Sequence, residues 1–184
     1  MQHQGTVTLE SDRLLLRRFT TADADAMFAN WASDEQVTRY LSWPTHESVE
    51  VTKSVLCDWS AGYDRADYYQ WAIVPKALGE PIGFIGAVRL DEQAETVEIG
   101  YCIGRKWWHQ GLTSEALSLV LPFFFTQVGA GRVETRHDID NPHSGGVMRK
   151  CGLRCEGTLR RAGRNNRGIV DVCVYGILAT DEAQ

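Results

Sequence analysis

Residues 98–116 read Glu-Ile-Gly-Tyr-Cys-Ile-Gly-Arg-Lys-Trp-Trp-His-Gln-Gly-Leu-Thr-Ser-Glu-Ala, and the fold can be worked out from this stretch. From residue 96 the side chains alternate between two faces, which predicts a strand over residues 96–103. One face is apolar, and the other carries Glu98, Gly100, Cys102 and Gly104. Glycine inside a strand often marks a bulge or a close approach by another group. We therefore expect Glu98 to lie beside a channel with little side-chain bulk.

A turn and a helix follow this strand. Gly111 precedes an apolar run that begins at Leu112, and the pattern predicts a helix to about residue 128 with a kink at Pro122. The backbone N–H groups of residues 109–114 should then point out of a strand-to-helix turn. Because the first N–H groups of a helix lack partners and lie at its positive end, this turn is a candidate anion site.

A second informative stretch is residues 138–153, which read Asp-Ile-Asp-Asn-Pro-His-Ser-Gly-Gly-Val-Met-Arg-Lys-Cys-Gly-Leu. Together the two stretches resemble the GNAT superfamily of acyl-CoA-dependent N-acetyltransferases. Within it they resemble the branch of the ribosomal-protein serine and alanine N-terminal acetyltransferases. The Gln/Arg-x-x-Gly-x-Gly/Ala loop is matched by residues 108–113, the Asn-x-x-Ser helix start by residues 141–144, and the Lys-x-Gly-Phe end by residues 150–153. The likeness covers roughly residues 9–178.

The resemblance implies a mixed α/β fold of the GNAT type. We expect a single N-acetyltransferase domain over residues 1–184, with loose tails at residues 1–6 and 180–184. Its twisted mixed sheet should have about seven strands, flanked by helices, beginning with one strand over residues 9–19. The fourth and fifth strands, residues 96–103 and 132–137, should splay apart and leave a wedge.

The resemblance also implies acetyl-CoA as co-substrate. Its pyrophosphate should lie against the backbone of His109, Gln110, Gly111, Leu112, Thr113 and Ser114. The pantetheine arm should follow the fourth strand at Tyr101, Cys102 and Ile103, with an N–H near Cys102 polarising the acyl carbonyl. Asn141 should contact the pantetheine amides, and it is also a good helix cap.

Two residues are candidates for proton transfer. Glu98 is the candidate general base, directly or through a water, with a salt-bridged or solvent-facing strand residue as the alternative. Where this chain has Met148, many superfamily members carry a tyrosine that protonates the departing thiolate. Ser144 is therefore the candidate proton donor, with Tyr101 and Tyr175 as alternatives. Some branch members carry a glutamate near Gly163, and its absence leaves ribosomal-protein acetylation open to question.

The expected reaction is acetyl transfer to a primary amine, most simply a protein N-terminus, by direct attack in a ternary complex. A small-molecule amine acceptor and a non-catalytic acyl-CoA-binding module are the alternatives, and Met148 is the one feature that favours the module. The oligomeric state stays open, with a homodimer among the alternatives.

Composition restricts the partners. The net charge of −5 over 184 residues argues against nucleic acid as a partner. Residues 1–5 lack a basic start before an apolar run, and the longest apolar block, residues 119–125, is too short for a bilayer. The five cysteines and five histidines show no metal-ligand spacing, so no metal is implied. We expect a cytoplasmic protein without a membrane partner.

Overall fold

The structure, a computed structural model, describes residues 1–181, so the end of the expected C-terminal tail, residues 182–184, lies outside it. One eight-stranded sheet organises the chain, in the order β1-β2-β3-β4-β5-β6-β8-β7. Neighbouring strands are antiparallel except β5 and β6, which are parallel. The strands are β1 (Leu9–Glu10), β2 (Leu14–Arg17), β3 (Gln70–Pro75), β4 (Gly83–Asp91), β5 (Thr96–Ile103), β6 (Arg132–Asp138), β7 (Arg154–Asn165) and β8 (Gly168–Leu178).

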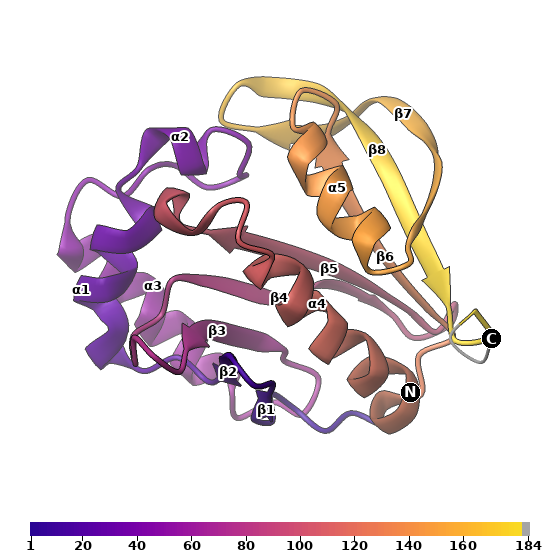
Figure 1. The fold of residues 1–184 in the computed structure, drawn as a ribbon, viewed down its shortest axis with the longest axis horizontal. Coiled ribbons are helices and arrows are strands. Elements are labelled where there is room, and N and C mark those ends of the chain that lie inside the picture. Colours follow the sequence, from indigo (N-terminus) through magenta and orange to yellow (C-terminus); the bar gives the residue numbers. More distant parts are fainter. Residues whose placement is uncertain (182–184) are drawn as a thin grey trace.

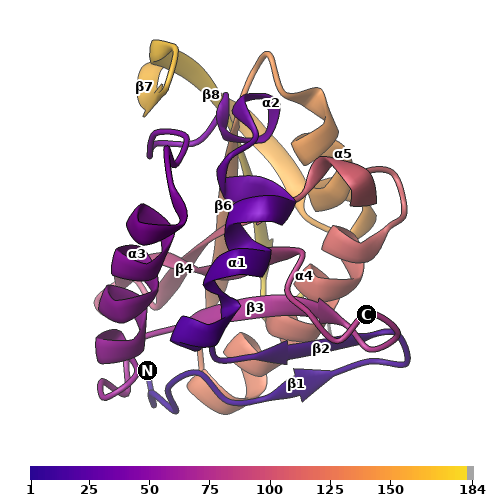
Figure 2. The ribbon, with the colours of Figure 1, turned by 90° about the vertical axis from the view of Figure 1, so that its left-hand side faces the viewer.

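Helices cover both faces of this sheet (Figures 1 and 2). Their bounds are α1 (Ala24–Met27), α2 (Glu35–Thr38), α3 (Val49–Gly62), α4 (Leu112–Pro122) and α5 (Pro142–Lys150). The larger apolar core contains buried residues of α4, such as Leu117 and Val120, together with Trp71 and Ile85 of the sheet. A second core joins Leu56 of α3 to the opposite face of the sheet, including Cys102. No helix within residues 1–181 is long and apolar enough to cross a membrane.

The sheet splits between β5 and β6, as the resemblance implied. The two strands pair only where residues 96–98 lie beside residues 132–134. Beyond Glu98 they diverge (Figure 1), and β6 continues its pairing with β8 instead. Because α4 follows the free end of β5 and α5 follows the free end of β6, both helices begin at the open side of the wedge.

Two local expectations, on residues 9–19 and on residues 1–6, are wrong, whereas the helix expected to about residue 128 is present but changes its form at Pro122. Residues 9–19 form not one strand but the β1–β2 hairpin, in which Leu9 pairs with Leu16. The helix after Gly111 leaves α-geometry at Pro122, and residues 123–128 form a π-helical segment, because proline cannot donate the next ladder hydrogen bond. Residues 1–6 are packed rather than loose: the N–H of Gln2 donates to Val128 O at 2.7 Å, and Thr6 is 2% exposed.

Candidate active site

A cleft of about 1190 Å³ lies in the split between β5 and β6. The residues assigned to acetyl-CoA and the two first candidates for proton transfer line it with one exception, namely Glu98, Tyr101, Cys102, Ile103, His109, Gly111, Leu112, Thr113, Ser114, Asn141 and Ser144. Gln110 is the exception, because its side chain donates to Lys106 O at 2.8 Å and borders a smaller neighbouring cavity. The wedge therefore brings together residues from two distant stretches of sequence.

The turn before α4 presents a row of unpartnered N–H groups. Within residues 1–181, the backbone N–H groups of residues 109–114 donate to no acceptor, and the first bond into the helix runs from Glu115 N to Gly111 O at 3.0 Å. Positive φ angles at His109 (61°) and Gly111 (76°) produce this turn. The ammonium group of Lys150, on α5, lies next to Gly111, since a Cβ at that position would be 3.3 Å from Nζ. The turn thus combines helix N–H groups with a cation, which suits an anion.

The free edge of β5 supplies further backbone groups. Gly104 N donates to Ile82 O at 2.8 Å, and backbone groups alternate in direction along an antiparallel strand, so the N–H of Cys102 points toward β4. The N–H groups of Tyr101 and Ile103 point to the open edge. Ile103 O there already accepts from the Trp108 indole at 3.0 Å. The N–H group expected near Cys102 to polarise the acyl carbonyl therefore belongs to Tyr101 or Ile103. The Cys102 side chain is buried, which raises the pKa of its thiol.

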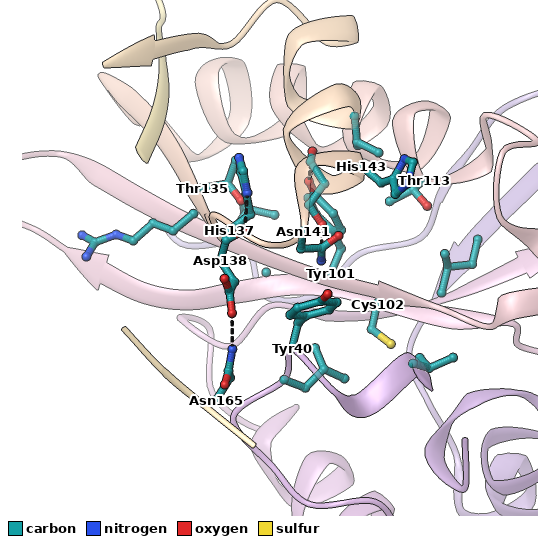
Figure 3. A pocket seen from close by; sticks show the side chains of 18 of the residues that line it. Tyr40, Tyr101, Cys102, Thr113, Thr135, His137, Asp138, Asn141, His143 and Asn165 are labelled. Atoms are coloured by element: carbon teal, nitrogen blue, oxygen red, sulfur yellow. Dashed lines mark hydrogen bonds between the residues drawn. The ribbon is translucent and has the colours of Figure 1, made fainter. Parts of the chain in front are cut away.

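Tyr101 and Asn141, which Figure 3 shows close together, both contact Ser144 on α5. The Tyr101 hydroxyl donates to Ser144 O at 3.0 Å, and burial raises the pKa of this phenol. Asn141 is the N-cap residue of α5, as expected, but its amide donates to Ser144 Oγ at 3.1 Å and its side chain accepts no helix N–H. Ser144 Oγ keeps its own proton for another acceptor.

Glu98 is held by two arginines. Its carboxylate oxygens lie 3.2 Å from Arg89 Nε and 3.4 Å from Arg136 Nε. The same arginines contact Glu134. Burial of Glu134 opposes its ionisation, but hydrogen bonds from Arg136 and Arg132 lower its pKa overall. Glu98 lines the cleft, but it belongs to an ion-paired network rather than lying alone over an apolar channel.

The positions where the chain departs from the branch lie in different surroundings. Met148 is 1% exposed within the larger core. Gly163 lines the cleft, where a Cβ would come within 2.5 Å of Val172 Cγ1. Tyr175, an alternative proton donor, accepts from Arg149 Nη1 at 2.7 Å behind the cleft wall.

Several cleft residues could not be found from sequence. Tyr40, Asp138 and Asn165 come from three separate segments, and Figure 3 shows them together beside the split. Asp138 is a buried carboxylate that accepts from Asn165 Nδ2 at 2.6 Å and from Asp140 N at 2.8 Å. The only sequence signal was the polar turn at residues 165–167, which on its own resembles any hairpin end.

Comparisons with known proteins agree with this geometry. Residues 13–154 match the acetyltransferase (GNAT) domain. The chain is 36% identical to the uncharacterized N-acetyltransferase YoaA of Bacillus subtilis (strain 168), covering 95% of this chain and 98% of that protein. It is 31% identical to the ribosomal-protein-serine acetyltransferase of Escherichia coli (strain K12), covering 73% of this chain and 75% of that protein.

Solved structures share the fold. The microcin C7 self-immunity acetyltransferase MccE, solved in complex with acetyl-CoA and AMP, superposes with a TM-score of 0.80 at 19% identity, covering 91% of this chain and 93% of that one. At that identity the likeness supports the fold alone, whereas the matched domain and the two relatives support the family. The chain therefore belongs to the acetyltransferase (GNAT) domain family, and it is an acetyl-CoA-dependent N-acetyltransferase.

Proposed function

We propose that the protein transfers the acetyl group of acetyl-CoA to a primary amine, with a protein N-terminus as the first candidate, by direct attack in a ternary complex. The observation that carries the proposal is the turn at residues 109–114, where six adjacent N–H groups without acceptors among the described residues lie next to Lys150. These groups would hold the diphosphate of acetyl-CoA. The name of the E. coli relative, a ribosomal-protein-serine acetyltransferase, supports the choice of acceptor.

The open edge of β5 would bind the rest of the donor. From the turn, the pantetheine arm would follow β5, with the N–H groups of Tyr101 and Ile103 as donors and Asn141 on the opposite wall. An N–H on this edge would also stabilise the negative charge that develops on the acyl oxygen during attack. That MccE was solved with acetyl-CoA supports this placement only through the shared fold.

Two side chains are proposed for the proton steps. Glu98 would take a proton from the attacking amine, directly or through a water, with Arg89 and Arg136 holding the carboxylate in place. Ser144 would help to protonate the departing thiolate, since its hydroxyl faces the cleft and accepts only from Asn141 among the described residues.

A small-molecule amine is the second candidate acceptor. Contacts from the segment after α2 to the opposite wall favour it, because they restrict that end of the cleft: the Tyr40 hydroxyl donates to Asp140 O at 3.0 Å, and Asn166 Nδ2 donates to Trp43 O at 2.7 Å. A short acceptor would fit under them without disturbing either contact. Cytoplasmic location and a homodimer stay predictions.

A panel assay tests the proposed function. Thiol release from acetyl-CoA should rise well above background with at least one member of a panel of N-terminal peptides and small amines. Mass spectrometry should show one added acetyl group on the amine. If coenzyme A binds but every acceptor leaves thiol release at background, the catalytic proposal is wrong and the binding-module alternative replaces it.

A further inference from the structure

Two arginines on the rim of the cleft are available for a ligand. Arg39, just after α2, and Arg164, near the end of β7, both line the cleft and are exposed. Within residues 1–181 neither side chain forms an ion pair or a hydrogen bond, and the guanidinium of Arg39 lies over the Tyr40 ring, 5.5 Å from its centroid. We call Arg39 and Arg164 the rim arginines.

A set of contacts holds the two rim arginines on neighbouring segments. Asn166, two residues after Arg164, donates through its side chain to Thr38 O at 2.9 Å and to Trp43 O at 2.7 Å. Its backbone N–H donates to Leu41 O at 3.0 Å. Three hydrogen bonds from one residue thus fix the hairpin turn against the segment that carries Arg39. The two cations share one rim although they are far apart in sequence.

The neighbouring charges leave the rim arginines uncompensated. Arg167, also on this turn, is already paired with Asp140 at 2.7 Å and lies 3.7 Å from Asp138. Two free guanidinium groups at one rim are unusual in a chain of net charge −5. The turn at residues 109–114 and Lys150 already provide for the diphosphate of the donor, so the rim arginines remain for another anion.

Negative charge lies deeper on the same wall. Asp138 is buried, lines the cleft, and accepts hydrogen bonds from Asn165 Nδ2 and Asp140 N, while Arg167 Nη1, 3.7 Å from its carboxylate, lies closer to Asp140. The wall is therefore cationic at its rim and anionic inside. This order of charges is complementary to a molecule that binds with its ammonium group toward Asp138 and its anionic group at the rim.

We propose that the acceptor carries an anionic group close to its reacting amine, and that Arg39 and Arg164 bind that group. The inference rests on the proposed function and narrows it to one class of amine. An N-terminal peptide with acidic residues just after its first positions has this chemistry, and so does a dicarboxylic amino acid. The rim arginines contact the acceptor away from the reacting atoms, so they should affect KM and not kcat.

Matched acceptors test the inference. One pair is a C-terminally amidated Ser-Ala-Asp-Glu peptide and its amidated Ser-Ala-Asn-Gln counterpart, and the other pair is the α-amides of glutamate and glutamine, because a free α-carboxylate would be an anion in both members. With the native protein, kcat/KM should be about tenfold higher for the acidic member of at least one pair, and which pair responds identifies the source of the anion. Arg39→Gln and Arg164→Gln should each raise KM for that acidic acceptor about two- to fivefold, the size expected of an exposed ion pair. KM for the amide acceptor and for acetyl-CoA should not change.

Controls separate this effect from a loss of structure. Arg160→Gln removes an exposed charge from the same strand at a position that does not line the cleft, and it should leave every KM unchanged. The preference for the acidic acceptor should also shrink as ionic strength rises from about 0.05 to 0.3 M, because salt screens exposed charges.

Three outcomes would overturn the inference. They are equal kcat/KM values within both pairs, an equal rise in KM for acidic and amide acceptors in the rim variants, and a rise in KM for acetyl-CoA in place of the acceptor. In each of these the protein still acetylates amines, so the proposed function stands. Absence of transfer to every amine would instead refute the proposed function, and this inference with it.

Discussion

The hydroxyl of Tyr101 donates to the carbonyl oxygen of Ser144 at 3.0 Å, which links β5 to α5 across the split in the sheet. The sheet itself provides no hydrogen bonds between β5 and β6 beyond residues 98 and 134. This side-chain bond therefore helps to set the width of the cleft where the donor would pass.

Tyr101→Phe should widen or loosen that part of the cleft. Loss of the bond removes the tyrosine donor from Ser144 O, at a cost of about 1 kcal/mol in the free energy of unfolding, and KM for acetyl-CoA should rise. Because burial raises the pKa of Tyr101, the hydroxyl keeps its proton up to pH 10 and the effect should be constant between about pH 6 and 9. Tyr69→Phe, which removes a hydroxyl from the core outside the cleft, should affect stability but not KM. An effect of Tyr101→Phe that grows with pH would contradict this assignment.

Gly111→Ala tests the turn that is proposed to hold the donor. Alanine at φ 76° costs about 1 kcal/mol, and its Cβ would displace Lys150 Nζ from 3.3 Å. The melting temperature should fall and KM for acetyl-CoA should rise severalfold. Gly129→Ala is a matched control, since Gly129 has the same φ of 76° but no heavy atom within 4 Å of the place that an alanine Cβ would occupy. If the two variants lose stability equally and neither changes KM, the turn does not bind acetyl-CoA.

Glu98→Gln tests the proposed base. Loss of a general base lowers kcat by about 100-fold while KM for acetyl-CoA stays the same. Arg89→Gln is the comparison: it removes one ion-pair partner but keeps the carboxylate, which Arg136 still contacts at 3.4 Å, so kcat should fall much less. Should Glu98→Gln lower the melting temperature but leave kcat and its pH profile intact, Glu98 has only a structural role.

Much of the fold, and the residues that line the candidate donor site, could be predicted because the signals were local. Alternation over residues 96–103 and a glycine ahead of an apolar helix are short-range patterns, and the structure places them as a strand and a helix with a cleft between β5 and β6. The resemblance contributed the splay, which no local pattern encodes. Local patterns failed where hydrogen bonding decided the detail, as at Asn141, whose amide bonds to Ser144 Oγ and whose side chain accepts no helix N–H.

The acceptor side was largely unpredictable from the sequence. Asn166 reaches Thr38, Leu41 and Trp43 across more than a hundred residues of sequence, and no periodicity reports such a pairing. The ion pairs of Glu98 likewise depend on the register of β4, β5 and β6, which a bulge shifts between Ala87 and Arg89. Side-chain roles that depend on tertiary neighbours needed the structure.

Asp23→Asn tests an ion pair that anchors the first helical segment. Burial opposes ionisation of Asp23, but Arg17 at 2.7 and 2.8 Å and the Thr20 N–H together lower its pKa. A carboxyl group whose pKa is lower in the folded than in the unfolded state stabilises the fold at pH values above its unfolded-state pKa. This contribution is lost as the pH falls through the folded-state pKa. The variant should therefore lose about 3 kcal/mol at pH 7, and the difference from the native protein should shrink below about pH 4.

Urea unfolding at pH 7 and at pH 3 measures the difference in the free energy of unfolding between Asp23→Asn and the native protein. Glu10→Gln, which removes an exposed ion pair with Lys76, should leave the unfolding midpoint almost unchanged at either pH. A loss in Asp23→Asn that stayed the same at pH 3 and pH 7 would mean that packing, and not the charge of Asp23, supplies the stability.

The central claim is that the turn before α4 binds the diphosphate of acetyl-CoA, and a crystal structure with coenzyme A tests it most directly. The account predicts diphosphate oxygens within hydrogen-bond distance, about 3 Å, of backbone nitrogens in residues 109–114, with Lys150 Nζ beside them. It also predicts the pantetheine arm along the open edge of β5. A diphosphate bound anywhere else on the protein, with those N–H groups still facing solvent, would contradict the account.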